Sequence, residues 1–121
     1  MKGFHVQLIS TSGDGLNVRF DDVCCQLAKI DRLHLEPDGS FVWVGDGWQL
    51  DGMLYDRDEY LQYVDLKGSC PAEIWRMLIS VLGGSALPMG VVSPATGDLY
   101  DLQTFANSVW PAAIGDGEYE E

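Results

Sequence analysis

Apolar and polar residues alternate at two places near the start of the chain. Residues 4–9 and residues 16–20 each carry apolar side chains at every second position, which is the period of a β-strand with one buried face. Residues 12–15 between them have the sequence Ser-Gly-Asp-Gly, which favours a turn. We therefore expect residues 4–20 to form a β-hairpin.

The apolar period then changes to that of a helix. Val23, Leu27 and Ile30 are spaced so that they share one helix face. Either of two neighbouring aspartates, Asp21 or Asp22, can cap the N-terminus, where acidic side chains also suit the helix dipole. These features predict a helix over residues 21–31, although residues 23–25 are also compatible with a strand.

The middle of the chain returns to strand-like patterns. β-Branched and aromatic residues are frequent here, and clusters of Pro, Gly and Asp separate the apolar runs. We expect strands at residues 33–36, 41–44, 48–55 and 60–66. The last two enclose residues 56–59 and therefore form a hairpin, called the middle hairpin below.

A second helix follows the middle hairpin. Cys70 takes the N-cap position, Pro71 the first helical position and Glu73 the third, an order favoured at helix N-termini. An apolar face continues to Leu82, and the glycines at 83–84 end the helix.

The remaining residues predict a strand, a helix and a tail. Residues 89–92 are a short apolar run between two prolines, as expected for a buried strand. A last helix begins at Gly97 or Asp98 and stops at Pro111. Residues 115–121 are acidic, so we expect a disordered tail there.

These elements predict one α+β domain over residues 1–114, with the order ββαββββαβα. Because hairpins connect most of the strands, we expect a mostly antiparallel sheet of six to seven strands with two or three helices on one face. The chain has 121 residues, of which 46% are hydrophobic, and this suffices for one core.

Charge narrows the classes of partner. Nineteen Asp and Glu face seven scattered Lys and Arg, for a formal net charge of −12. Such a chain repels a polyanion, so we expect no direct binding of nucleic acid. No apolar run is long enough to span a bilayer, and the first residues lack the pattern of a secretion signal. We expect a cytoplasmic protein with no membrane contact.

Single reactive side chains give weak signals. Cys24, Cys25 and Cys70 lack the spacing of a zinc site and are expected to be reduced, structural thiols. Cys70 at a helix N-terminus is a candidate nucleophile. The simpler hypothesis is that it serves as a small capping residue. His5 and His34 lie in predicted strands and are expected to be structural.

The tryptophans are expected to be mainly core anchors. An exposed patch that includes Trp43, Trp48 or Trp110 would instead mark a protein interface.

Asp51, Asp65 and Lys67 are the strongest candidates for chemistry. If the apolar residues of both strands of the middle hairpin face one core, then the sequence numbers of two residues that lie opposite each other must add up to an even number. Tyr55 then lies opposite Leu61 and Asp51 opposite Asp65, with Lys67 on the same face. This register needs a three- or five-residue loop, whereas a symmetric four-residue loop separates the two aspartates.

Two carboxylates and an amine on one face are suited to binding a divalent cation beside a phosphate. This arrangement resembles the PD-(D/E)xK nuclease superfamily, with an Asp on one strand, D/E-x-K on the next and then a helix. The resemblance covers about residues 41–93 and implies that Asp51 and Asp65 bind Mg²⁺ while Lys67 positions the nucleophile. The chain departs from the family at Leu50, where the motif has Pro, and it has no basic surface for DNA.

Three functional hypotheses follow. We favour a non-catalytic protein-interaction or regulatory module without a cofactor, which binds a protein partner or a second copy through a sheet face or edge. The acidic charge, the aromatic content and the lack of a convincing catalytic set motivate it. The first alternative is the Mg²⁺-dependent nuclease or phosphoryl-processing domain. The second is an acidic mimic of nucleic acid that occupies a basic partner's site.

Overall fold

Seven antiparallel strands and three helices make up residues 2–13, 15–83 and 89–111, the residues that the computed structural model describes. The strands are β1 (Phe4–Ser10), β2 (Leu33–Leu35), β3 (Ser40–Gly45), β4 (Trp48–Arg57), β5 (Tyr60–Gly68), β6 (Met89–Val92) and β7 (Leu99–Asp101). The helices are α1 (Phe20–Ala28), α2 (Ala72–Val81) and α3 (Leu102–Val109). The predicted α+β class is confirmed. The predicted tail at 115–121 lies outside the described residues.

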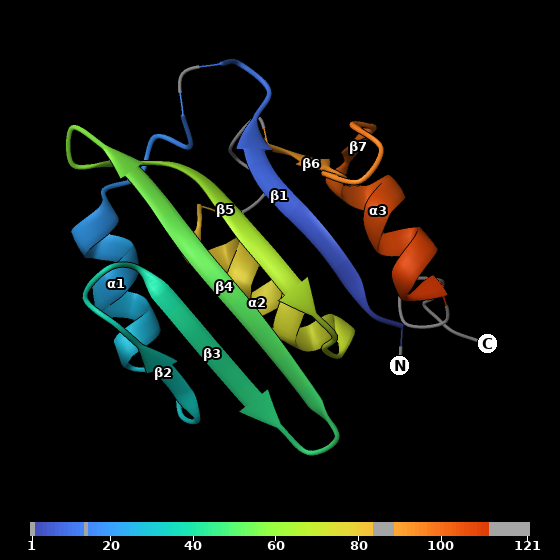
Figure 1. Cartoon of the computed structure of the whole chain (residues 1–121), viewed down its shortest axis with the longest axis horizontal. Coiled ribbons are helices and arrows are strands. Elements are labelled where there is room, and N and C mark those ends of the chain that lie inside the picture. Colours follow the sequence, from blue (N-terminus) through green and yellow to red (C-terminus); the bar gives the residue numbers. More distant parts are fainter. Residues whose placement is uncertain (1, 14, 84–88, 112–121) are drawn as a thin grey trace.

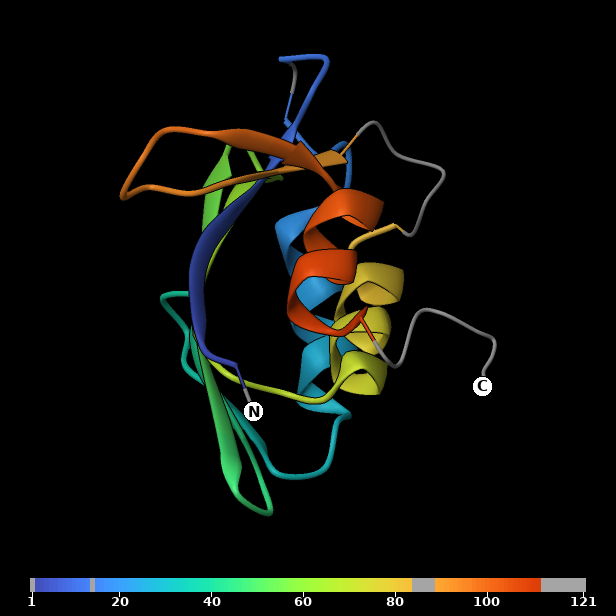
Figure 2. The same ribbon diagram turned by 90° about the vertical axis from the view of Figure 1, so that its right-hand side faces the viewer.

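The sheet has the strand order β2-β3-β4-β5-β1-β6-β7. All three helices lie on one of its faces, and the sheet curves around them (Figure 1, Figure 2). We call the face toward the helices the inner face and the opposite one the outer face. The outer face carries no helix of the described residues, so the molecule has two layers.

The inner face supplies the sheet side of the core because apolar residues occupy alternate strand positions. Leu8, Leu50 and Leu66 are fully buried there. The helices complete the core with Val23, Leu27, Trp75, Leu78 and Phe105. Burying one such side chain stabilises the fold by up to about 1.5–3 kcal/mol, so this core is the main source of stability.

Four aromatic rings join β1 to α2 and α3. The ring of Phe4 meets those of Trp75, Phe105 and Trp110 edge-on, with centroids 5.6–5.8 Å apart. Trp110 and Trp43 are buried and Trp48 is half-buried. The alternative of an exposed tryptophan patch is therefore wrong, and these residues are core anchors as expected.

The predicted hairpin of residues 4–20 is wrong, because β1 pairs with β5 and β6, which lie far away in sequence. The second predicted strand, residues 16–20, makes a few main-chain hydrogen bonds to the middle hairpin. The Leu16 N–H donates to the Leu61 carbonyl at 3.0 Å, and the Leu61 N–H donates to the Val18 carbonyl at 2.8 Å. Asn17 between them has a φ of 59°, a left-handed conformation that interrupts an extended strand.

A strand forms where the sequence predicts the start of the last helix. β7 pairs with β6, and α3 begins only at Leu102. Asp101 ends the strand and caps the helix, since its side chain accepts a hydrogen bond from the Thr104 N–H at 2.7 Å. The order is therefore βαββββαββα rather than ββαββββαβα.

The other two helices begin differently from the prediction. Pro71, rather than Cys70, is the N-cap residue of α2, and Arg19 is that of α1. Neither cap makes a side-chain hydrogen bond. Asp21 and Asp22 lie in the first turn of α1, where their charge still suits the dipole. None of the helices among the described residues is long and apolar enough to cross a membrane.

Candidate functional site

The outer face presents its side chains in rows across the sheet, because cross-strand partners point the same way. The first row consists of His5, Lys67, Asp51, Val42 and His34. The second consists of Leu99, Val92, Gln7, Asp65, Met53 and Ser40. Tyr63 and Tyr55 pair in a third row.

Asp51, Asp65 and Lys67 all lie on this face, as the apolar pattern predicts. Their register differs from the prediction by two residues. Lys67 lies opposite Asp51, and Asp65 lies opposite Met53. The predicted facing pair of Asp51 and Asp65 is therefore wrong, and the two carboxylates occupy neighbouring rows.

A β-bulge explains the register. The hairpin turn contains only Asp58 and Glu59, with φ values of 53° and 73°, the left-handed pair typical of two-residue turns. Next to this turn, Arg57 lies opposite Tyr60, so the sequence numbers of opposite residues add up to an odd number there. Gln62 is an extra residue on β5 and restores an even sum for the rest of the hairpin. No three- or five-residue loop is needed.

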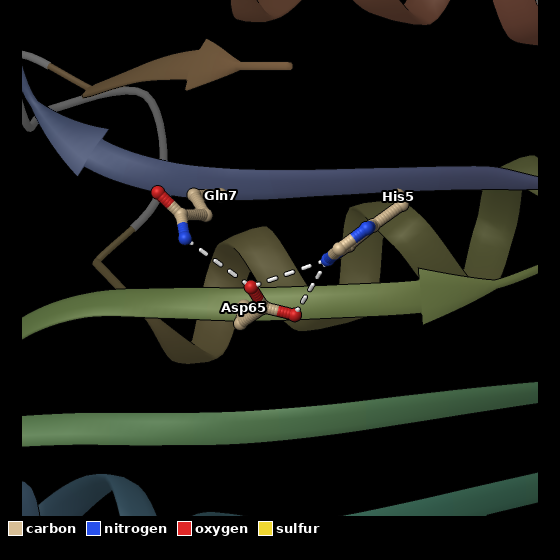
Figure 3. Close-up of polar contacts among 3 residues, drawn as sticks. All are labelled: His5, Gln7 and Asp65. Atoms are coloured by element: carbon tan, nitrogen blue, oxygen red, sulfur yellow. Dashed lines mark hydrogen bonds and ion pairs between the residues drawn. The ribbon is translucent and has the colours of Figure 1, made fainter. Parts of the chain in front are cut away.

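Asp65 is contacted by two side chains of β1. His5 Nε2 lies 3.1 Å from Oδ1 and 3.3 Å from Oδ2, and Gln7 Nε2 donates to Oδ2 at 3.3 Å (Figure 3). The His5 side chain is 48% exposed and that of Asp65 26%, so this contact contributes at most about 1 kcal/mol. Both carboxylate oxygens are engaged, which leaves Asp65 less able to bind a cation.

Asp51 and Lys67 face each other without forming an ion pair. The ion pairs among the described residues are His5–Asp65, Arg19–Glu59 and Arg32–Asp46. Asp51 instead accepts a hydrogen bond from Gln49 Nε2 at 2.9 Å. Within residues 2–13, 15–83 and 89–111, no three His, Cys, Asp or Glu side chains gather in a way that could hold a metal ion. His34 is exposed at the edge of its row, so the expectation that it is a structural histidine is wrong.

Aromatic and aliphatic side chains occupy two other parts of the outer face, one on β4 and β5 and one on β6 and β7. The rings of Tyr55 and Tyr63 stack with centroids 4.4 Å apart and planes inclined by 13°. Tyr55 is 40% exposed and Leu99 58%, and Met53 is half-buried. Figure 2 shows the turn between β6 and β7 projecting past β1 on this side.

Sequence reasoning singled out the charged residues of this face and missed the apolar ones. The signal was present, because Met53 and Tyr55 alternate with the buried Leu54 along β4. That alternation places both residues on the outward side.

Cys70 does not provide a nucleophile. Cys70 is fully buried, and this burial raises the pKa of its thiol from the ordinary 9.0 to about 12, so no thiolate forms at neutral pH. The hypothesis of an activated Cys70 is wrong. Burial beside Asp21 and Asp56 also raises the pKa of Cys24. Cys25 is exposed.

Open cavities also lie at two places along the sheet, and His5 of the outer face belongs to the lining of one of them. One, of about 440 Å³, adjoins the turn of the middle hairpin, and its lining is mostly polar: Gly13, Asn17, Arg57, Asp58, Tyr60 and Gln62. The other, of about 250 Å³, lies between β1, α3 and the β6–β7 hairpin.

Comparison of this chain with protein-family models, with curated proteins and with solved structures finds no match.

Proposed function

We propose that this chain is a non-catalytic protein-interaction module, that its binding surface is the outer face, and that its partner is a second copy. The observation that carries this proposal is a sheet face on which the described residues place no helix and which displays Met53, the Tyr55–Tyr63 stack and Leu99. Met53, Tyr55 and Tyr63 are neighbours on β4 and β5, and Gln7 and Asp65 separate them from Leu99. Apolar side chains that cluster on a surface in this way are typical of interfaces.

The charge of this face supports a second copy as the partner. The whole chain has a formal net charge of −12. In the three rows named above, however, the charged side chains are Asp51, Asp65 and Lys67, apart from two histidines. In a two-fold pairing, Lys67 of one copy can approach Asp51 of the other, so one surface complements itself.

The outer face is large enough for this pairing, and the charge repulsion between two copies is too weak to prevent it. Strands spaced by about 4.8 Å and a ten-residue β4 give a face of at most about 29 by 33 Å. That exceeds the roughly 800 Å² that each partner buries in a standard interface. At a Debye length of about 8 Å, two charges of −12 about 25 Å apart repel by only on the order of 1 kcal/mol.

Sedimentation equilibrium of the wild type and of two methionine variants tests the proposal. We expect a dimer whose dissociation constant falls as NaCl rises from 20 to about 500 mM, because salt screens the repulsion. Met53→Glu should raise the dissociation constant at least about tenfold, since it places a carboxylate in the apolar part of the interface.

Met77→Glu is the matched control, because Met77 is 47% exposed on α2 and lies on the side of the molecule away from the outer face. It should leave the dissociation constant unchanged. A monomer at every salt concentration, or equal effects of the two substitutions, contradicts the proposal.

A further inference from the structure

Among the residues that the structure describes, part of β1 has an open edge. β6 pairs with β1 only from Met89, opposite Ser10, to Val92, opposite Gln7. The next residues turn away, with the Ser93 N–H donating to the Asp98 carbonyl at 3.0 Å. Pro94 follows and has no N–H for a ladder. Within the described residues, Phe4–Val6 therefore pair only with β5.

An edge of this kind has a defined chemistry. In a strand, every second residue directs its N–H and C=O toward the same neighbour. The open side of residues 4–6 therefore offers main-chain donors and acceptors at the spacing of another strand, which an extended backbone can satisfy.

A groove runs along this open edge. α3 lies beside the first half of β1, with the β6–β7 hairpin at one end (Figure 1). The groove has a volume of about 250 Å³ and is lined on the far side from β1 by Ser93, Tyr100, Phe105, Ser108 and Val109. Phe105 and Val109 are buried and form an apolar floor.

The charged group of the groove lies at the end remote from β6. Lys2 Nζ donates to the Ser108 carbonyl at 3.3 Å. An ammonium group has three N–H donors, so two remain for another acceptor. Among the lining residues no carboxylate competes for them.

We propose that this groove binds an extended peptide that adds a strand antiparallel to β1, with its C-terminal carboxylate at Lys2. Every strand pair in the sheet is antiparallel. A strand that continues the direction of β6 runs from Val6 toward Gly3, so its C-terminus reaches Lys2. Alternate side chains of the peptide point onto Phe105 and Val109, which favours apolar residues at those positions.

This inference does not depend on the proposed dimer interface, which adjoins the groove at His5. The groove lies at an interrupted edge of β1, between the two layers, whereas the outer face is the broad surface of the sheet. A variant that breaks the dimer, Met53→Glu, should leave the groove unchanged.

The test uses a fluorescent, N-acylated tetrapeptide of alternating valine and threonine, with either a free carboxylate or an amide at its C-terminus. We expect the free acid to bind with a dissociation constant on the order of 1 mM. Amide resonances of residues 3–6 should shift on binding, and hydrogen exchange should slow at those amides that point away from β5. The amide-terminated peptide should bind at least about fivefold more weakly.

Three variants locate the site. Lys2→Ala should lower the affinity for the free acid to that of the amide and leave the amide unaffected. Lys29→Ala, an exposed lysine after α1, should change neither affinity. Ser108→Trp, on an exposed position of α3, should fill the groove and weaken both peptides.

The proposal is overturned if neither peptide binds up to about 5 mM, if the shifts map elsewhere, or if Lys2→Ala weakens both peptides equally. It is also overturned if those amides of residues 4–6 that point away from β5 are protected in the free protein. Protection that rises with protein concentration would identify a second copy at this edge, and constant protection would identify another part of the same chain.

Discussion

The indole Nε1 of Trp110 donates a hydrogen bond to the main-chain carbonyl of Cys70, 2.8 Å away. This buried contact connects the end of α3 to the residue just before Pro71, the N-cap of α2. The two segments are separated by 40 positions in sequence, so the bond belongs to the tertiary structure.

We expect Trp110→Phe to lower the free energy of unfolding by about 1–3 kcal/mol, because it leaves the Cys70 carbonyl buried without a partner. Guanidinium chloride titration measures this loss. Trp48→Phe is the control: Trp48 is half-buried and packs edge-on against Trp43. A loss at Trp48 as large as that at Trp110 would contradict the role of the hydrogen bond.

The raised pKa of Cys70 predicts a fall in stability at alkaline pH. The folded thiol keeps its proton up to about pH 12, whereas the unfolded thiol ionises near 9. Between these values the folded state binds more protons, so the free energy of unfolding falls as pH rises. The largest contribution is about 1.4 kcal/mol per pH unit.

Urea titrations in reducing buffer at pH 8, 9 and 10 check this prediction. Cys70→Ala should be less stable than the wild type at pH 8, because it leaves a small cavity. Its stability should nevertheless decline less steeply with pH. Parallel declines for the two proteins would show that Cys70 does not cause the effect.

The turn of the middle hairpin stores backbone strain. Asp58 has a φ of 53°, a conformation that glycine adopts more readily than residues with a Cβ. Asp58→Gly should therefore raise the free energy of unfolding by up to about 1 kcal/mol.

Gly47 provides the opposite test. It has a φ of 78°, and a Cβ there would meet nothing within 4 Å. Gly47→Ala should lower the free energy of unfolding by about 1 kcal/mol through backbone strain alone. Thermal unfolding monitored by circular dichroism measures both changes, and a shift in the same direction for both would refute the argument.

The outer-face carboxylates should bind Mg²⁺ weakly at best. Asp65 already accepts from His5 and Gln7, and Asp51 lies in the neighbouring row. We expect isothermal titration calorimetry to detect no site with a dissociation constant below about 1 mM, because a hard cation needs several oxygen ligands that converge. Saturable heat that disappears in Asp65→Ala would reverse this expectation and restore the nuclease hypothesis.

The strands of the middle of the chain were predictable because local pattern and turn chemistry determine them. Phe41 and Trp43 are buried on β3, as Leu50 and Leu54 are on β4, and period-two alternation identifies all four. The bulge also left a signal in the sequence. Leu61 and Val64 are both buried although they are three residues apart, which simple alternation does not permit.

The partners of β1 were not predictable in the same way. Its pairing with β5 joins His5 to Lys67 and Gln7 to Asp65, and no local pattern contains this information. The contact between His5 and Asp65 spans 60 positions, so the candidate site could be predicted only as far as one hairpin extends. β7 was missed because Leu99–Asp101 is too short for periodicity to distinguish a strand from the first turn of a helix.

The extra residue at Gln62 also determines where the middle hairpin can lose a residue. Removing Gln62 would leave Asp56 opposite Leu61 and Tyr55 opposite Tyr63 in an unbroken ladder, so Val64 and Leu66 would stay in the core. Removing Asp65 from the regular part of β5 would instead turn Leu66 to the solvent. Natural or engineered variants of this hairpin should therefore tolerate a one-residue deletion at the bulge far better than one farther along β5.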